Sequence, residues 1–99
     1  MIIGSITPYC VYITSNPGRT TFYTGVTNDL ERRMYEHYES RGNKLKFAGK
    51  YFCYELVYYE CYPNMKMAIR REDEIKNLSH DKKMQLIKCM NPKLRRLVF

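Results

Sequence analysis

The side chains in this sequence that are best suited to chemistry are two tyrosines, an arginine, a histidine and a glutamate: Tyr12, Tyr23, Arg33, His37 and Glu72. Hydrolysis of a phosphodiester needs a positive charge to offset the phosphate, a carboxylate to hold a hard metal ion and a base to deprotonate water. These five residues supply all three. A single carboxylate suits Mg²⁺ or Mn²⁺, whereas zinc would need more Cys or His ligands. We therefore expect one divalent ion at Glu72.

Each of these residues also has an ordinary structural explanation. Two facing tyrosines are a common cross-strand packing pair. Arg33 could form a salt bridge on a solvated surface, and His37 could satisfy the last carbonyls of a helix and its dipole. Glu72 could belong to an internal ion pair with Arg33, Lys76 or Arg71. Taken singly, the residues leave both interpretations open.

Two short strands are expected to carry the tyrosines. Residues 9–14 and 20–24 are rich in β-branched and aromatic residues, and the intervening SNPGR is typical of a turn. A turn centred on its Pro-Gly pair places Tyr12 opposite Tyr23, so that both side chains lie on one face. A slip of one residue would place them on opposite faces.

A helix is expected to carry the arginine and the histidine. Gly25 ends the second strand, and Asn28 with Glu31 resembles a capping box at the start of the helix. Arg33 and His37 are four residues apart, which places them on the same edge of the buried stripe.

The second half of the chain predicts one strand and two helices. A polar, glycine-containing link covers residues 40–50, and the apolar run at residues 53–61 is typical of a strand. A helix follows over residues 65–78, and another begins after Ser79 and ends at Asn91. The order of elements is therefore ββαβαα, an α+β domain.

Glu72 falls on the side of its helix that should face the protein interior. Burial of a carboxylate is costly unless the charge has a partner, so its position calls for an ion or a cation nearby. The apolar residues expected to face inward on the two helices are Ala68, Ile69, Ile75, Met84, Ile87 and Met90.

Length and charge limit the possible functions. Ninety-nine residues correspond to one domain, 1–99, with a core of about residues 9–87 and a basic tail at 88–99. A net charge of +7 favours polyanionic partners, nucleic acid first and an anionic membrane surface second. The cations expected to track phosphates, or else to form a solvated helix face, are Lys82, Lys83, Lys88, Arg95 and Arg96.

The sequence also predicts the compartment. It contains no apolar run of membrane-spanning length, and its first residues lack the pattern of a secretory leader. The spacing of the cysteines, Cys10, Cys53, Cys61 and Cys89, fits neither a zinc finger nor a disulfide scaffold, so we expect reduced thiols. The expected protein is soluble and intracellular, in the cytoplasm.

Several short segments together resemble the GIY-YIG nuclease domain. In chain order they are Cys10-Val11-Tyr12, Tyr23-Thr24-Gly25, the run from Asp29 to Arg33 with His37, and Arg71-Glu72 ahead of Ile75-Lys76. Each segment is weak alone, but the ordered series is specific and runs from about Tyr9 to Ile87. LVYYE followed by AIRREDEIK most resembles a group of small standalone proteins. That group is similar to the amino-terminal domain of the excinuclease that makes the incisions in bacterial nucleotide excision repair.

The resemblance implies a fold and a role for each residue. The fold is a small antiparallel three-stranded sheet flanked by helices. Tyr12 would act as general base or orient water, and Tyr23 would position water or phosphate. Arg33 would contact the scissile phosphate, with His37 one turn later, and Glu72 would bind the single divalent metal.

Two features qualify the role of Tyr12 and the match to the family. A phenol has a reference pKa of about 10, so Tyr12 needs help from positive charge or from His37 to activate water. The sequence also has CVY where the family name has GIY, and Val26 where some members have a lysine.

The expected function is therefore a metal-dependent DNA endonuclease, a monomer acting on branched or damaged DNA in repair or recombination, with a protein partner as a source of specificity. One alternative is a nucleic-acid-binding or recruitment module with the same fold and little or no cleavage. Another is a protein-interaction domain that uses exposed tyrosines.

Overall fold

The fold is a three-stranded antiparallel sheet with helices on both faces, given by a computed structural model that describes residues 8–97. The strand order is β2-β1-β3, so β1 is central. The elements in chain order are β1 (Tyr9–Ser15), β2 (Phe22–Thr27), α1 (Leu30–Glu39), α2 (Phe47–Lys50), β3 (Glu55–Tyr62), α3 (Met65–Lys76) and α4 (His80–Met90). The predicted α+β class and three-stranded antiparallel sheet are confirmed.

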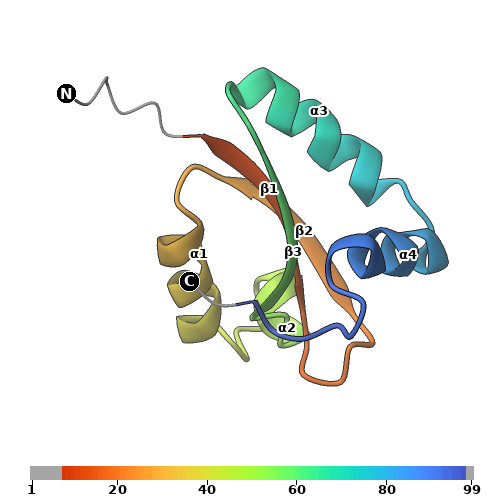
Figure 1. Ribbon diagram of the computed structural model, residues 1–99. Helices are drawn as coiled ribbons and strands as arrows, with labels where there is room; N and C mark the ends of the chain where they lie inside the picture. The colour runs from red at the N-terminus through yellow and green to blue at the C-terminus, as the bar shows by residue number, and fades with distance from the viewer. Residues whose placement is uncertain (1–7, 98–99) are drawn as a thin grey trace.

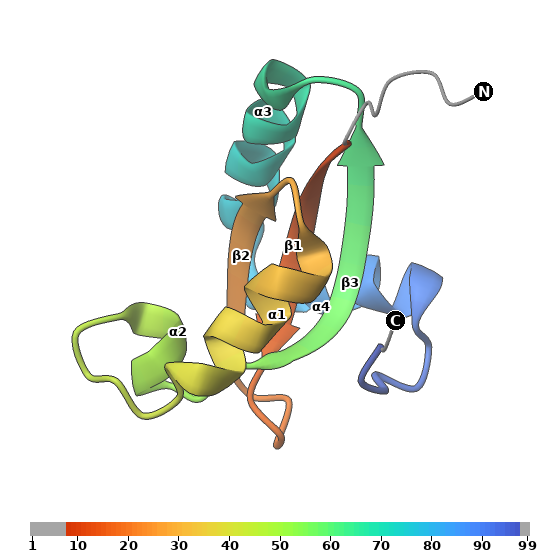
Figure 2. The ribbon, with the colours of Figure 1, turned by 90° about the vertical axis from the view of Figure 1, so that its left-hand side faces the viewer.

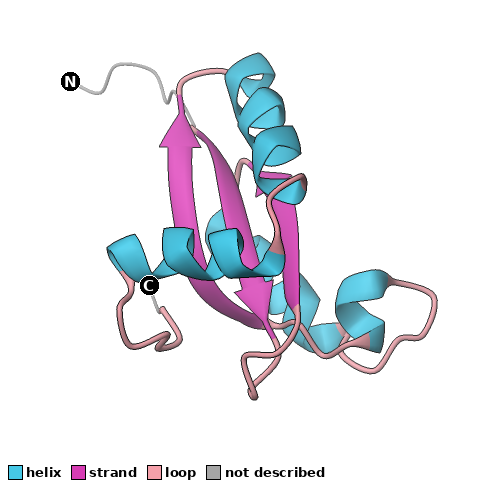
Figure 3. Cartoon of the chain, turned by 90° about the vertical axis from the view of Figure 1, so that its right-hand side faces the viewer, coloured by secondary structure: helices cyan, strands magenta, loops and turns pink. Residues whose placement is uncertain are grey.

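The helices lie in two layers. Figure 1 shows the sheet nearly edge-on, with α1 on one side and α3 and α4 on the other. Seen from the first side, α1 crosses in front of the strands and α2 lies beside it (Figure 2). The view from the opposite side shows α3 and α4 instead (Figure 3). The short helix α2, at Phe47–Lys50, lies within the segment that the sequence predicts as a link.

The main hydrophobic core lies between the sheet and α3 with α4. Side chains alternate along β1, so Val11 and Ile13 face this core while Tyr12 faces α1. Its buried members are Val11, Ile13, Phe22, Val57, Tyr58, Ala68, Ile75 and Ile87. The core thus leaves the α1 face of the sheet available for polar side chains.

The register of the β1–β2 hairpin differs from the predicted one by two residues. Tyr12 pairs with Gly25, and Tyr23 pairs with Thr14, so the predicted Tyr12–Tyr23 pairing is wrong. Gly25 lies inside β2, which continues to Thr27, rather than at the end of the strand. Because the slip is an even number of residues, both tyrosines still share one face.

The hairpin loop explains the slip. Arg19 adopts a left-handed backbone with φ 60°, and its guanidinium bonds to Glu55 Oε1 at 2.7 Å and to the Leu94 carbonyl at 2.8 Å. The Arg19 amide also donates to the Asn16 carbonyl at 3.0 Å, and the chain reverses one residue later than the Pro-Gly pair. Local bonds hold the loop as well, because Asn16 Oδ1 accepts from the Thr20 and Thr21 amides, each at 2.9 Å.

The helices begin and end close to their predicted limits, with a few corrections. The N-cap of α1 is Asp29, whose carboxylate accepts from the Arg32 amide at 3.1 Å, so Asn28 is not the cap. Ser79 caps α4 as predicted. Ile69 and Met90, which are expected to face inward, are 49% and 44% exposed, because the inward stripe of each helix is narrower than its apolar pattern.

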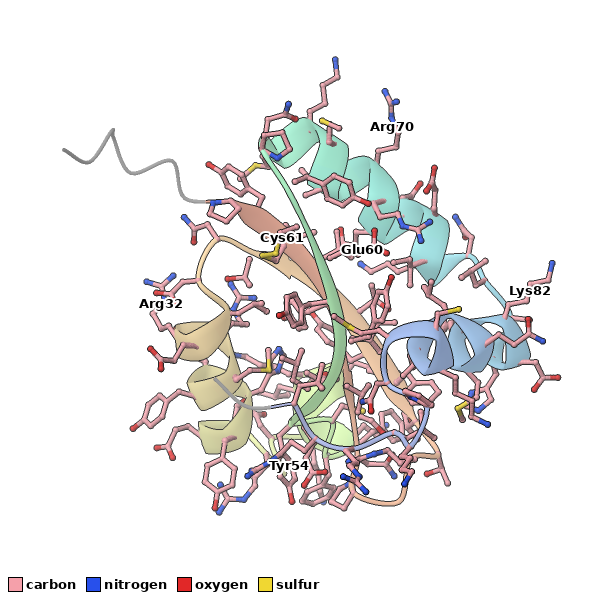
Figure 4. The ribbon with its side chains drawn as sticks, viewed as in Figure 1. Arg32, Tyr54, Glu60, Cys61, Arg70 and Lys82 are labelled. Atoms are coloured by element: carbon pink, nitrogen blue, oxygen red, sulfur yellow. A yellow bond between two sulfur atoms is a disulfide. The ribbon has the colours of Figure 1, made fainter. Side chains whose placement is uncertain are left out.

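Two cysteines form a bond that the sequence does not predict. Cys10 on β1 lies directly opposite Cys61 on β3, and their sulfurs form a disulfide (Figure 4). The expectation of reduced thiols is therefore wrong for this pair, whose members are 51 residues apart in the chain and meet only through strand pairing. Cys53 and Cys89 are free thiols, as expected.

The described helices include no candidate for crossing a bilayer: within residues 8–97, none is long and apolar enough. The expectation about a leader concerns residues 1–7, which lie outside the described residues.

The end of α4 is tied to the sheet through one buried side chain. Asn91, only 7% exposed, caps the helix, and its amide donates to the Val57 carbonyl at 3.0 Å and to the Arg95 carbonyl at 2.6 Å. Its Oδ1 accepts from the Arg95 amide at 3.0 Å. The helix ends at this residue as predicted, and the same residue fastens the following segment to β3.

We expect Asn91→Ala to lower the free energy of unfolding by about 1–3 kcal/mol, because it leaves buried backbone groups without partners. Urea denaturation measures the loss. Asn77→Ala is the matched control, since the Asn77 amide makes an exposed bond to the Asp73 carbonyl at 2.9 Å. Its change should stay within about 0.5 kcal/mol. Equal losses in the two variants would contradict the proposed tie.

Candidate active site

A hydrogen bond joins the first candidate tyrosine to the candidate histidine. Tyr12 Oη lies 2.7 Å from His37 Nε2, between the central strand and α1. Tyr12 is fully buried. The ring of His37 also meets the rings of Tyr12 and Tyr23 edge-on, with centroids 5.5 and 5.3 Å apart. The three residues that the sequence places on separate elements therefore form one cluster.

Two members of the cluster, Tyr23 and His37, line a cavity of about 570 Å³. His37 and Arg33 come from α1, and Tyr23 comes from β2. The complete lining is Tyr23, Arg33, Glu36, His37, Ser40, Lys46, Phe47 and Ala48. Tyr12 is not part of this lining and is linked to it through its hydrogen bond with His37.

Gly25 makes room for the Tyr12 ring. A Cβ atom at Gly25 would lie 2.5 Å from Tyr12 Oη and 2.6 Å from Tyr12 Cζ, which is closer than packed atoms approach. The Tyr12 ring therefore packs over β2 at Gly25, where a residue with a side chain would clash with it. The glycine of the Tyr23-Thr24-Gly25 segment serves packing against the first tyrosine, not chain reversal.

Burial controls protonation in the cluster. Desolvation by burial raises the pKa of Tyr12, and the nearby Tyr23 raises it further, although the Arg33 guanidinium opposes both. Burial also lowers the pKa of His37 to about 4, assisted by the positive charges of Arg33 and Lys46. At neutral pH, Tyr12 is a protonated phenol and His37 is a neutral imidazole that can accept a proton.

Arg33 presents a positive charge to the cavity. Its Nε lies 3.1 Å from Glu36 Oε1, one turn along α1. This contact is an ion pair without hydrogen-bond geometry, because Arg33 Nε has no hydrogen-bond partner within residues 8–97. This Nε is itself buried, but the Arg33 side chain is 34% exposed and lines the cavity, so its positive charge is available to an anion such as a phosphate.

Glu72 is held by one of the three cations that the sequence offers as partners. Its Oε2 lies 3.2 Å from Lys76 Nζ, and its side chain is 21% exposed. Arg71 instead pairs with Glu60 at 2.8 Å. The charge of Glu72 contributes to the raised pKa of Tyr12, so the carboxylate lies within electrostatic range of the cluster.

The donor set at Glu72 fits a hard divalent ion. Residues 8–97 contain no group of three or more His, Cys, Asp or Glu side chains arranged to hold a metal. Mg²⁺ commonly takes one or two carboxylates and completes its shell with water and substrate phosphate, whereas zinc takes several protein ligands. A single, partly exposed carboxylate agrees with Mg²⁺ or Mn²⁺ and disagrees with a zinc site.

Comparison with known families identifies the chain. The family model described as the GIY-YIG catalytic domain matches residues 8–85, which include every residue of the cluster and Glu72. The chain belongs to the GIY-YIG family. Membership of this family places the chain among nucleases and accounts for the two tyrosine segments, the α1 arginine and the α3 glutamate on which the resemblance depends.

Individual GIY-YIG relatives agree with this assignment. A UPF0213 protein of Haloquadratum walsbyi is 39% identical over 66 residues, which cover 67% of this chain and 72% of the relative. A UPF0213 protein of Staphylococcus saprophyticus is 36% identical over 67 residues, covering 68% and 79%. The solution NMR structure of a UPF0213 protein from Bacillus halodurans has a TM-score of 0.55 and 31% identity, covering 87% of this chain and 88% of that one.

The cations predicted to track phosphates lie mostly away from the GIY-YIG cluster. Lys82, Lys83 and Lys88 belong to α4, on the opposite face of the sheet from α1. Figure 4 shows Arg32 of α1 and Lys82 of α4 pointing outward on opposite sides. Arg96 lines a second cavity of about 290 Å³, between α1 and β3. A role in nucleic-acid binding for these residues and Arg95 remains a prediction.

The sequence interpretation missed the part of the cavity that α2 supplies. Lys46 and Phe47 lie in the predicted link, and both line the cavity with Ser40. A signal was present, because a segment between helix and strand that combines several lysines with aromatic residues is unusual for a plain connection. Only the packing of α2 beside α1 shows that Lys46 and Phe47 belong to the site.

Proposed function

We propose that this protein is a metal-dependent DNA endonuclease that hydrolyses phosphodiester bonds. One observation carries the proposal: a neutral, proton-accepting histidine and a partly exposed, positively charged arginine line the same cavity in a GIY-YIG domain. Hydrolysis of a phosphodiester needs a proton acceptor for water and a cation for the phosphate, and this cavity offers both.

Arg33 and Lys46 would bind the scissile phosphate. Both line the cavity, and both already lower the pKa of His37 through their charges. A bound phosphate would offset those charges, so the pKa of His37 would rise toward its ordinary value once substrate is in place. The histidine thus becomes a stronger base when a phosphate is bound in the cavity. Tyr23, on the same wall, would orient that water or a phosphate oxygen.

His37 would take the proton of the attacking water, with Tyr12 as its positioning residue. In the tautomer in which Nε2–H donates to the Tyr12 oxygen, Nδ1 is left as the acceptor. The water oxygen forms a bond to phosphorus and its proton goes to Nδ1. The bond between phosphorus and the leaving oxygen breaks, and that oxygen keeps the bonding pair and takes a proton from solvent. Tyr12 also remains a candidate base, as the family resemblance implies, but its burial favours a role through His37.

Glu72 would hold the divalent ion, Mg²⁺ or Mn²⁺. When bound, such an ion supplies charge stabilisation to the phosphate in the transition state. Lys76, which is paired with Glu72, would have to release the carboxylate for the ion to bind. Glu72 lies on α3, outside the cavity lining but within electrostatic range of Tyr12. A carboxylate in that range would only repel DNA in a simple binding module, so Glu72 favours the enzyme over a recruitment module without cleavage.

The biological setting proposed is DNA repair or recombination, with branched or damaged DNA as substrate. The domain is small, so a protein partner would supply further specificity to an active monomer. Incubation with flapped, branched, single-stranded and double-stranded DNAs would identify the preferred structure.

We expect DNA cleavage in Mg²⁺, none in EDTA, and at least a tenfold lower rate for Glu72→Gln, because a carboxamide holds Mg²⁺ poorly. Gel analysis of end-labelled DNA measures the rates. Glu74→Gln is the matched control on the same helix, since Glu74 is 57% exposed and pairs with Arg71. Its rate should match that of the unmodified protein. DNA binding without cleavage on any substrate would instead establish the recruitment module.

A further inference from the structure

A row of aromatic rings leads from the cavity onto α2. The ring of Tyr23, in the cavity wall, stacks on Phe47 with centroids 6.3 Å apart and planes 29° apart. Phe47 in turn packs against Tyr51 with centroids 4.8 Å apart. Phe47 and Tyr51 are 52% and 42% exposed. Large rings so exposed, next to a polar cavity, present an apolar surface that the fold itself does not cover.

The backbone around this surface is held firmly. The Gly42 amide donates to the Gly49 carbonyl at 2.8 Å, and the Cys53 amide donates to the Ala48 carbonyl at 2.8 Å. A Cβ atom at Gly49 would lie 2.5 Å from the Ser40 carbonyl oxygen, so α2 packs directly on the end of α1. The rings are therefore presented on a fixed support, which lowers the entropy cost of binding a ligand.

The charge of this segment indicates what would cover the rings. Residues 40–54 contain four basic side chains and no acidic one: Arg41, Lys44, Lys46 and Lys50. Lys46 lines the cavity, and Lys50 Nζ lies 5.3 Å from the centre of the Tyr51 ring. Exposed rings among cations suit a strand of nucleic acid, in which each base offers a flat face and each phosphate a negative charge.

We propose that Phe47 and Tyr51 form a base-stacking subsite for an unpaired nucleotide next to the scissile phosphate. The phosphate would lie at Arg33 and Lys46 in the cavity, and the neighbouring base would stack on Phe47. A paired base is covered by its neighbours in the duplex and cannot use this surface. The inference rests on the proposed function and specifies its substrate: DNA with unpaired bases at the position of cleavage.

The test measures binding in EDTA, where cleavage does not interfere. A single-stranded 12-nucleotide DNA with 2-aminopurine reports stacking, because its fluorescence falls when the base stacks on a ring. We expect Phe47→Leu to weaken binding about tenfold and to abolish the quenching, and Phe47→Trp to restore both. Tyr35→Leu is the control, since Tyr35 is 66% exposed but lines the second cavity. Its affinity should be unchanged.

An abasic DNA of the same length separates stacking from a structural effect of Phe47 on Tyr23. If Phe47 acts by stacking, Phe47→Leu and the unmodified protein should bind the abasic DNA with equal affinity. Equal losses on both DNAs, or no loss on either, would overturn the subsite. The two proposals can fail separately. Binding that depends on Phe47, without cleavage in Mg²⁺, would support the subsite and contradict the nuclease. Cleavage that Phe47→Leu leaves unchanged would support the nuclease and contradict the subsite.

Discussion

His37→Gln is expected to lower the rate of DNA cleavage by about 10²–10⁴-fold, the range typical for loss of a general base. Glutamine keeps a polar group next to Tyr12 but cannot take up a proton near neutral pH. The fold should survive, because His37 lies on α1, outside the main core beneath α3 and α4. Single-turnover cleavage in Mg²⁺, compared with the unfolding curves of both proteins, measures the effect.

Tyr12→Phe distinguishes a positioning residue from the base itself. If Tyr12 acts through the 2.7 Å bond to His37, its loss should cost less than the loss of His37. If Tyr12 takes the proton directly, the loss should be at least as large. If Tyr12→Phe cleaves DNA more slowly than His37→Gln, the general base is Tyr12 and not His37.

The pH dependence of kcat/KM belongs to the same prediction. The pKa of His37 is lowered to about 4 in the free protein, so the neutral form persists well below the ordinary value of 6.5. Activity should be lost as the pH falls through about 4 and should show no inflection from this residue near 6.5. An inflection near 6.5 that disappears in His37→Gln would contradict the lowered pKa.

Gly25→Ala is expected to impair both stability and cleavage. The new Cβ would lie 2.5 Å from Tyr12 Oη, so the ring must shift and the bond to His37 must break or stretch. The ring is fully buried and has little space to move. Overpacking of this kind costs about 1–3 kcal/mol, and the cleavage rate should fall at least as far as in Tyr12→Phe. Urea unfolding and single-turnover cleavage measure the two effects.

Gly18→Ala provides the control for Gly25→Ala. A Cβ at Gly18 would approach no closer than 3.7 Å, to Asn16 Nδ2 in the exposed hairpin loop. Its stability and cleavage rate should remain those of the unmodified protein. If Gly25→Ala were equally harmless, the close packing of Tyr12 across β2 would not matter for the site.

Local patterns predicted most of the elements, because capping residues and alternation act over short stretches of chain. Ser79 begins α4 and Asn91 ends it as its sequence predicts. The hairpin register does not follow from the Pro-Gly pair, because the loop is held by local bonds to Asn16 and by the Arg19 side chain, which bonds to Glu55 and Leu94 far along the chain. The disulfide between Cys10 and Cys61 is likewise not predicted by local patterns, because these residues are 51 positions apart and meet only through strand pairing.

The candidate site was predicted only in part. The spacing of Arg33 and His37 correctly placed both on one edge of α1, and the even spacing along the strands kept Tyr12 and Tyr23 on one face despite the slip. The sequence could not show that Tyr12 is buried behind His37. Burial depends on the neighbours that pack around a side chain, not on the side chain itself.

The chemical groups, the order of the elements and the resemblance to GIY-YIG nucleases follow from the amino-acid sequence, because each depends on residue type and local spacing. Which groups share the cavity depends on how the elements pack. This packing brought α2 with Lys46 and Phe47 to the site and left the lysines of α4 on the opposite face of the sheet. Helix and strand periodicity act over a few residues, whereas packing joins residues that are distant in the chain.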